Sequence, residues 1–115
     1  MNLRLVGAEG ENQAAEYLLE RGYIILHRNF GCRFGEVDLV VLEPTGVVVF
    51  VEVKAGRDKS YGSPALRISP SKLRTITKVA DLYLRTHNLV GKEWRIDAVI
   101  VWNDSIRWLK NCITV

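Results

Sequence analysis

Three ionisable residues lie where an apolar strand pattern ordinarily excludes charge. Asp38 falls in the valine-rich run 36–42, and Glu52 and Lys54 fall in the next such run, 47–54. Burying an unpaired carboxylate costs several kcal/mol, so acids in such places usually pair with a cation or bind a metal ion. These residues are therefore the first candidates for a functional site.

The spacing of these residues predicts that they meet on one face of a sheet. Side chains two residues apart on a strand share a face, so Glu52 and Lys54 point the same way. The segment Glu43-Pro44-Thr45-Gly46 between the runs indicates a hairpin. A three-residue loop at 44–46 puts Asp38 directly across the ladder from Glu52, whereas a two-residue turn would misplace Asp38.

Two interpretations fit this group of charges. One is a structural salt bridge from Lys54 to Asp38 or Glu52. The other starts from the surplus of acids around one cation, which includes Glu36 on the face of Asp38 and leaves negative charge for a second cation. Carboxylate oxygens without Cys or His nearby suit Mg²⁺ or Mn²⁺ better than zinc. The surplus favours a divalent metal site with Asp38 and Glu52 as ligands.

The chemistry that such a site suits is hydrolysis of a phosphodiester bond. A divalent ion held by two carboxylates can polarise a phosphoryl oxygen and lower the pKa of a bound water. Lys54 can stabilise the negative charge that builds up in the transition state, or orient the attacking water. No covalent nucleophile is required, and no Ser/His/Asp or Cys/His arrangement stands out in the sequence.

Glu11 is a third candidate carboxylate. Residues 8–21 have a helical pattern, and at about 100° per residue Glu11 shares a face with small and apolar residues: Gly7, Ala14, Ala15 and Leu18. The other acids of this helix, Glu9, Glu16 and Glu20, project to the opposite side. Glu11 is therefore predicted to face the sheet and the metal site. The alternative is that it only favours the positive end of the helix dipole.

Basic residues follow the second strand run. Arg57 lies in the polar segment 55–69, and Lys72, Arg74 and Lys78 lie on the helix predicted after it. A solvated helix face is the common explanation of such charges. Beside a phosphate-cleaving site they could instead bind a nucleic-acid backbone, and both interpretations stay open. Arg95 and Asp97, on one face of a later strand, are predicted to be a structural pair.

The elements that must position these residues indicate an α/β fold with a mixed central sheet flanked by helices. The pattern predicts a helix at 8–21 stopped by Gly22, and a second at 70–87 capped by Ser69 with Pro70 in its first turn. Strands are predicted at 23–27, 36–42, 47–54, 94–102 and 106–110. Near-continuous apolar character in the hairpin strands predicts a sheet covered on both faces.

Length and composition bound the class of protein. A chain of 115 residues fits one domain, 1–115, and 48% hydrophobic with 25% charged residues is typical of a soluble globular protein. The net charge of +3 is compatible with a polyanionic partner but is also common without one. Two isolated cysteines, no secretory signal and no apolar run near ~20 residues predict a cytoplasmic protein without a membrane span.

The motif strands resemble a known nuclease pattern. Gly35-Glu36-Val37-Asp38 followed by Phe50-Val51-Glu52-Val53-Lys54 is similar to the split acid–acid–lysine motif of the PD-(D/E)xK nuclease superfamily. That superfamily includes many restriction enzymes and the archaeal Holliday-junction resolvases. The wider set resembles the YraN-like family of small bacterial proteins, and it comprises residues 7–15, Gly22-Tyr23, Asn29, the two motif strands, Lys72, Arg95 and Asp97.

The resemblance implies a restriction-endonuclease-like fold in a single nuclease-like domain. It implies metal binding by Asp38 and Glu52, a catalytic role for Lys54, and a match of Glu11 to the first-helix glutamate of the resolvases. Gly31 and Gly56 depart from the family because basic residues are expected there, although Arg33 and Arg57 lie close by.

The expected function is that of a metal-dependent nuclease acting on DNA, extended by the resolvase resemblance to branched or structured DNA. A homodimer is an expectation by the same analogy, since a junction has two strands to cut. Two alternatives remain from the residues themselves. One is a nucleic-acid-binding module with little or no turnover, and the other is a protein-interaction domain with a structural ion cluster.

Overall fold

The structure is a computed structural model that describes residues 3–56, 68–102 and 105–112, with side chains from Glu9 onward. It contains two helices and five strands in the order α1 (Leu3–Glu20), β1 (Ile24–Cys32), β2 (Gly35–Leu42), β3 (Val48–Gly56), α2 (Pro70–Thr86), β4 (Trp94–Trp102) and β5 (Ser105–Leu109). Neither helix, within the part of the chain that is described, is long and apolar enough to cross a membrane.

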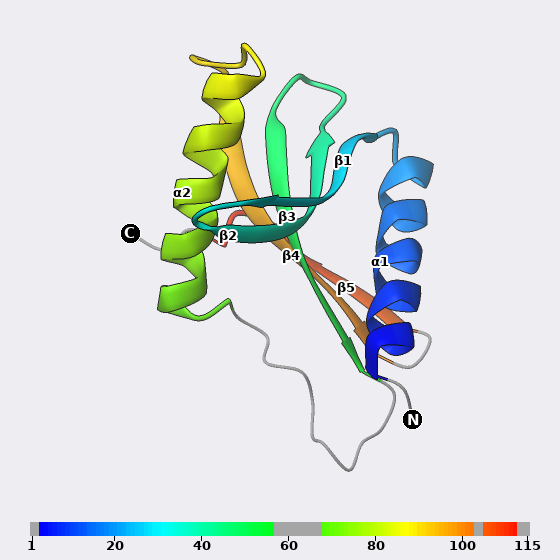
Figure 1. The fold of residues 1–115 in the computed structure, drawn as a ribbon. Helices are drawn as coiled ribbons and strands as arrows, with labels where there is room; N and C mark the ends of the chain where they lie inside the picture. The colour runs from blue at the N-terminus through cyan, green and yellow to red at the C-terminus, as the bar shows by residue number, and fades with distance from the viewer. Residues whose placement is uncertain (1–2, 57–67, 103–104, 113–115) are drawn as a thin grey trace.

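The strands form one mixed sheet with the spatial order β1-β2-β3-β4-β5. β1, β2 and β3 make an antiparallel meander, β4 runs parallel to β3, and β5 returns antiparallel to β4. The connection from β3 to β4 includes α2, and the two helices lie on opposite faces of the sheet (Figure 1). This confirms the predicted α/β fold with a mixed sheet flanked by helices, the arrangement expected of a restriction-endonuclease-like domain.

The β2–β3 hairpin has the register that the sequence predicts. Glu43 N–H donates to the Val47 carbonyl at 2.9 Å, which leaves the three-residue loop 44–46. Gly46 closes the loop with a φ of +101°, a left-handed conformation that glycine adopts without steric cost. The ladder continues to the pair Leu39–Val51, so the next positions along the two strands are 38 and 52.

β1 is longer than predicted. The sequence predicts a strand at 23–27, but the strand continues to Cys32, which pairs with Gly35 across a two-residue turn. β1 is an edge strand and most of its residues are exposed or half-buried, so it shows little of the apolar alternation from which a strand is predicted. Helix α1 likewise begins at Leu3 instead of residue 8.

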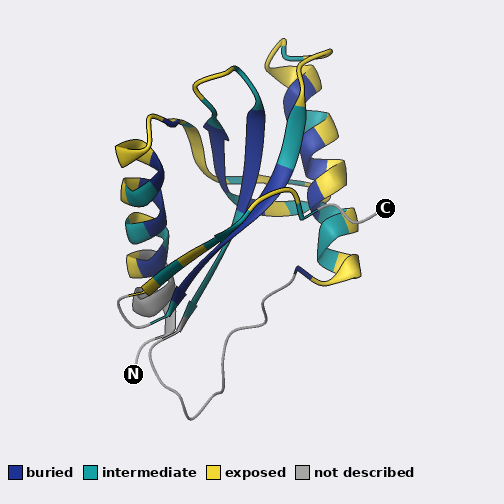
Figure 2. Cartoon of the chain, turned by 180° about the vertical axis from the view of Figure 1, so that it is seen from behind, coloured by how far each residue is buried: buried dark blue, intermediate teal, exposed yellow. Residues whose placement is uncertain are grey.

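The apolar core lies on both faces of the sheet, as predicted. Phe50, Ile76 and Ile96 pack between the sheet and α2, and Leu18, Leu39 and Val51 pack between the sheet and α1. The buried residues of β2, β3 and β4 form continuous stretches in the middle of the sheet (Figure 2). Fully burying each such side chain contributes about 1.5–3 kcal/mol. The packed core holds the strands in place and so positions the charged residues that interrupt them.

Helix α1 approaches β3 closely at Gly10. A Cβ atom at Gly10 would lie 2.5 Å from Cβ of Ala55, closer than two such atoms can pack. Gly10 is buried, and Ala14 and Ala15 continue the contact face. The small residues of this helix therefore allow it to lie directly over β3, with Glu11 beside the point of contact.

Candidate functional site

Asp38 lies where β2 separates from β3. The last paired residues of this ladder are Leu39 and Val51. Asp38 directly precedes Leu39 on β2. Its Oδ2 atom accepts a hydrogen bond from Val53 N–H at 2.7 Å. The carboxylate thus satisfies a β3 donor at the end of the paired region, and this contact fixes its position at the divergence of the two strands.

Glu52 is in direct contact with Asp38. Its side chain is only 15% exposed. Burial raises the pKa of Glu52 to about 8, and a hydrogen bond with Asp38 and the negative charge of Asp38 act in the same direction. Glu52 is therefore mostly protonated at neutral pH, and we call Asp38 and Glu52, which share this hydrogen bond, the acid pair.

Two lysines flank this acid pair. The Lys72 ammonium lies 3.7 Å from Glu52 Oε2 and donates to the Glu36 carbonyl at 3.4 Å. The charges of Lys72 and Lys54 both lower the pKa of Glu52, although less than burial and Asp38 raise it. Lys54 follows Glu52 by two residues on β3, and strand alternation places the two side chains on one face.

Helix α2 is built so that Lys72 faces the acids. Ser69 is its N-cap, with its Oγ accepting from Lys72 N–H at 3.1 Å, and Pro70 occupies the first turn. Both features were predicted, and they begin the helix at the divergence of β2 and β3. Sequence reasoning assigned Lys72 to a nucleic-acid surface, whereas the structure places it against Glu52 and Glu36.

Glu11, on α1, interacts electrostatically with Asp38. Burial raises its pKa, followed by the negative charge of Asp38 and, more weakly, that of Glu36. A hydrogen bond with Asn29 lowers the pKa and offsets part of this rise. The charge of Asp38 thus acts on Glu11, and a role of Glu11 in the site stays a prediction.

Asn29 is the residue that joins Glu11 to the sheet. Arg28 pairs with Leu39 in the β1–β2 ladder. The next residue, Asn29, therefore lies opposite Asp38, and it has a φ of +52°, a left-handed conformation that asparagine tolerates better than most residues. The sequence reasoning noted Asn29 only through the family resemblance. The predicted strand ended at residue 27, so no pattern in the sequence marked Asn29 as a strand residue.

The donor set fits a hard divalent cation in part. Among the residues described, no three His, Cys, Asp or Glu side chains are gathered closely enough to form a metal-binding group. Asp38 and Glu52 are in direct contact and offer only oxygen atoms, the ligands that Mg²⁺ and Mn²⁺ prefer. The structure thus brings two of the three predicted ligands together, and the metal role of Glu11 stays a prediction.

The remaining basic candidates are not part of this cluster. Arg74 and Lys78 are exposed and lie one turn apart on the outer face of α2. Lys72, about 160° from Arg74 and about 120° from Lys78 at helical spacing, lies on the inner side. Arg57 falls outside the described residues. Nucleic-acid binding by these residues stays a prediction.

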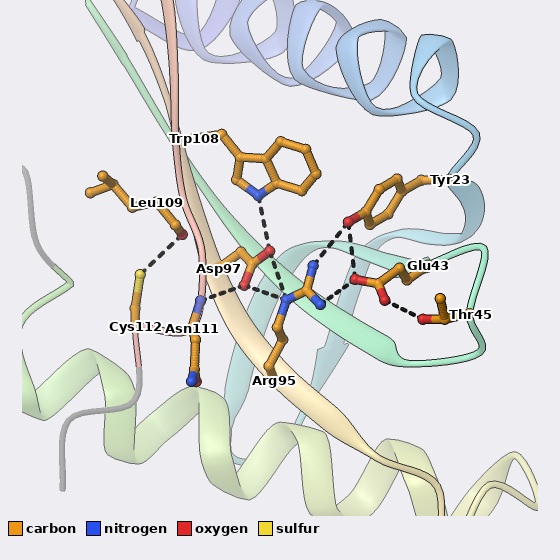
Figure 3. Close-up of polar contacts among 9 residues, drawn as sticks. All are labelled: Tyr23, Glu43, Thr45, Arg95, Asp97, Trp108, Leu109, Asn111 and Cys112. Atoms are coloured by element: carbon orange, nitrogen blue, oxygen red, sulfur yellow. Dashed lines mark hydrogen bonds and ion pairs between the residues drawn. The ribbon is translucent and has the colours of Figure 1, made fainter.

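A second polar cluster, on β4, is structural. Asp97 is fully buried and accepts hydrogen bonds from Arg95 Nε at 3.0 and 3.2 Å, from Trp108 Nε1 at 2.9 Å and from Asn111 N–H at 2.8 Å (Figure 3). Both oxygens of the carboxylate are therefore satisfied, which removes the penalty of burying its charge. Arg95 and Asp97 form the structural pair that the sequence predicts.

The same arginine anchors the β2–β3 hairpin. Arg95 forms an ion pair with Glu43 and donates to the Tyr23 hydroxyl at 3.0 Å (Figure 3). A hydrogen bond from Thr45, together with Arg95, lowers the pKa of Glu43 to about 2. Because Glu43 begins the hairpin loop, this cluster stabilises the register that places Asp38 opposite position 52.

Comparison with known proteins identifies relatives across most of the chain. A family model described as "Uncharacterised protein family UPF0102" matches residues 10–101. A UPF0102 protein of Persephonella marina is 43% identical over 91% of this chain and 90% of its own length. One of Syntrophus aciditrophicus is 45% identical over 87% of this chain and 77% of its own length. A relative in Neisseria gonorrhoeae is 38% identical, with 91% of each chain covered.

Proposed function

Because this chain belongs to the uncharacterised protein family UPF0102, whose name assigns no activity, we propose its function from the candidate site. We propose a metal-dependent nuclease that hydrolyses phosphodiester bonds in DNA, including branched or structured DNA. The observation that carries the proposal is the partly buried contact between Asp38 and Glu52, with lysine ammonium groups beside it.

In this proposal the two carboxylates hold Mg²⁺ or Mn²⁺. When bound, the ion would polarise a phosphoryl oxygen and lower the pKa of a water molecule. Asp38 is held in place by Val53 N–H and therefore needs no reorganisation to act as a ligand. Glu52 must first give up the proton that it shares with Asp38 at neutral pH.

The cations of the site are suited to the charge of the substrate. Lys54 follows Glu52 on β3, and its positive charge lowers the pKa of Glu52. It can therefore stabilise negative charge that develops on a phosphate bound beside Glu52. Lys72 contacts Glu52 from α2 and adds a second positive charge. Together they would offset the repulsion between the carboxylates and a phosphate backbone. A homodimer that cuts both strands of a junction remains part of the proposal by analogy.

One specific observation supports a second candidate function. The acid pair shares a proton and lies beside two lysines, so its charge is already neutralised without any added cation. A nucleic-acid-binding module without turnover would need nothing more than this arrangement. Cleavage of DNA distinguishes the two functions.

The test is incubation of the purified protein with linear, flapped and four-way DNA in Mg²⁺, in Mn²⁺ and in EDTA. A nuclease gives cleavage products with a divalent ion, none in EDTA, and none for Asp38→Asn in any condition. Glu20→Gln, an exposed acid on α1, is the matched control and should cleave as the wild type does. DNA binding without cleavage in every condition would instead establish the binding module.

A further inference from the structure

The turn of the β1–β2 hairpin presents an aromatic side chain to solvent. Cys32 pairs with Gly35, so Arg33 and Phe34 form the two-residue turn. The Phe34 side chain is 39% exposed, and the Arg33 guanidinium lies 4.8 Å from the centroid of its ring. We call these two residues the hairpin tip. An exposed aromatic ring can stack on a flat group of a partner, and the guanidinium beside it can attract the partner's negative charge.

The hairpin tip is fixed relative to the rest of the molecule. Gly35 has a φ of +146°, and a Cβ atom there would lie 2.5 Å from Cγ2 of Thr75. The turn therefore lies directly against α2. The Lys72 ammonium, which contacts Glu52, also donates to the Glu36 carbonyl at 3.4 Å, two residues after Phe34.

The hairpin tip is also near the acid pair. Phe34 is the turn residue directly before β2, and it precedes Asp38 by four residues. At about 3.4 Å per residue this is at most about 14 Å along β2. A polynucleotide with one phosphate at the acid pair would therefore extend as far as the hairpin tip within a few nucleotides.

We infer that the hairpin tip stacks against an unpaired base of a nucleic-acid substrate, close to the phosphate at the acid pair. The inference rests on the proposed function and names its substrate class, which is nucleic acid with locally unpaired nucleotides. Every base has a π face on which an aromatic ring can stack, so this contact requires no sequence. Inside a duplex, neighbouring bases cover both faces of each base, so the Phe34 ring cannot stack on them. Arg33 adds a positive charge for the backbone of the same strand.

Other exposed apolar residues lack this combination. Ile24 is exposed at the opposite end of β1, eight residues before Cys32, and Val90 is 74% exposed in the segment between α2 and β4. Both side chains are aliphatic, and neither residue takes part in a cation–π contact among the described residues. Phe34 thus differs from Ile24 and Val90 because a cation lies beside its ring, and it is also near the acid pair.

The experiment measures binding in EDTA at low salt, where no cleavage occurs, by fluorescence anisotropy of a labelled single strand and of a blunt duplex. Phe34→Ala should weaken single-strand binding about tenfold, the lower part of the range for loss of a stacking ring, and duplex binding less than twofold. Phe34→Trp should retain wild-type binding, whereas Phe34→Leu should lose as much as Phe34→Ala. Val90→Ala is the control and should change neither affinity.

Several results would overturn the inference. They are an equal loss on single strand and duplex, full binding by Phe34→Leu, and absence of single-strand binding by the wild type. Unchanged binding by Phe34→Ala would also overturn it and would point to a protein partner at the hairpin tip. Thermal unfolding of each variant verifies that it is folded. Because the binding assay contains no divalent ion, these failures are distinct from a failure to cleave DNA, which would overturn the proposed function.

Discussion

Cation binding to the acid pair should release a proton from Glu52. The pKa of Glu52 is about 8, against an ordinary value of 4.5, because burial and contact with Asp38 disfavour its charged form. Only the charged form can bind Mg²⁺ or Mn²⁺. The apparent affinity should therefore follow the deprotonated fraction of Glu52, which rises about tenfold per pH unit well below pH 8 and levels off above it.

The magnitude follows from the same pKa. The deprotonated fraction is about 1% at pH 6 and about one half at pH 8, so the affinity for Mg²⁺ should increase about fiftyfold over this interval and change little above it. Isothermal titration calorimetry in two buffers of different ionisation enthalpy measures both the affinity and the proton count. Close to one proton should be released per ion at pH 7.

Glu52→Gln tests the assignment of this proton. The variant should lose most of its Mg²⁺ affinity and all of the pH dependence between pH 6 and 8, whereas Glu20→Gln should match the wild type. Affinity that is constant from pH 6 to 8, or binding without proton release, would refute the reasoning. So would an unchanged fiftyfold increase in Glu52→Gln.

The same pKa has a consequence for stability without a metal ion. The folded-state pKa of Glu52 lies above its ordinary value, so its contribution to stability is complete below about pH 4.5 and is lost as the pH rises through 8. The metal-free wild type should thus lose stability over this interval relative to Glu52→Gln. Urea unfolding of both proteins at pH 5 and pH 8.5 measures the difference.

Three further predictions concern the residues that support the acid pair. Gly10→Ala should lower the free energy of unfolding in urea by about 1–3 kcal/mol, because the added methyl group collides with β3, whereas Gly31→Ala, with open space around it, should not. Arg95→Met should lower it by about 3–5 kcal/mol, because it leaves a buried carboxylate unpaired; a loss below 1 kcal/mol would contradict this role. Glu11→Gln should weaken Mg²⁺ binding in calorimetry, whereas exposed Glu16→Gln should not, and equal effects would make Glu11 a surface residue.

The register of the site could be predicted because it depends on local chemistry. Pro44 and Gly46 fix a three-residue loop, and counting outward from it places Asp38 opposite Glu52. Strand alternation then places Lys54 correctly. The N-cap at Ser69 is equally local, since it depends on a hydroxyl and the backbone three residues later.

The parts that the sequence did not reveal depend on contacts between distant segments. Lys72 follows Glu52 by twenty residues, and only the packing of α2 on the sheet brings the two side chains to 3.7 Å. The left-handed backbone of Asn29 and the continuation of β1 to Cys32 arise from pairing at a solvent-exposed edge, where apolar periodicity is weak. The distance of Glu11 from the acid pair is likewise set by the position of the whole helix.

The most direct test of the central claim is the cleavage rate of Lys54→Ala on four-way or flapped DNA in Mg²⁺, measured beside its DNA affinity. Lys54 shares the β3 face of Glu52 and is proposed to act on charge that develops during hydrolysis, not on binding. We predict loss of cleavage with DNA affinity within about threefold of the wild type, since one positive charge among several is removed. Cleavage at the wild-type rate by Lys54→Ala would contradict it.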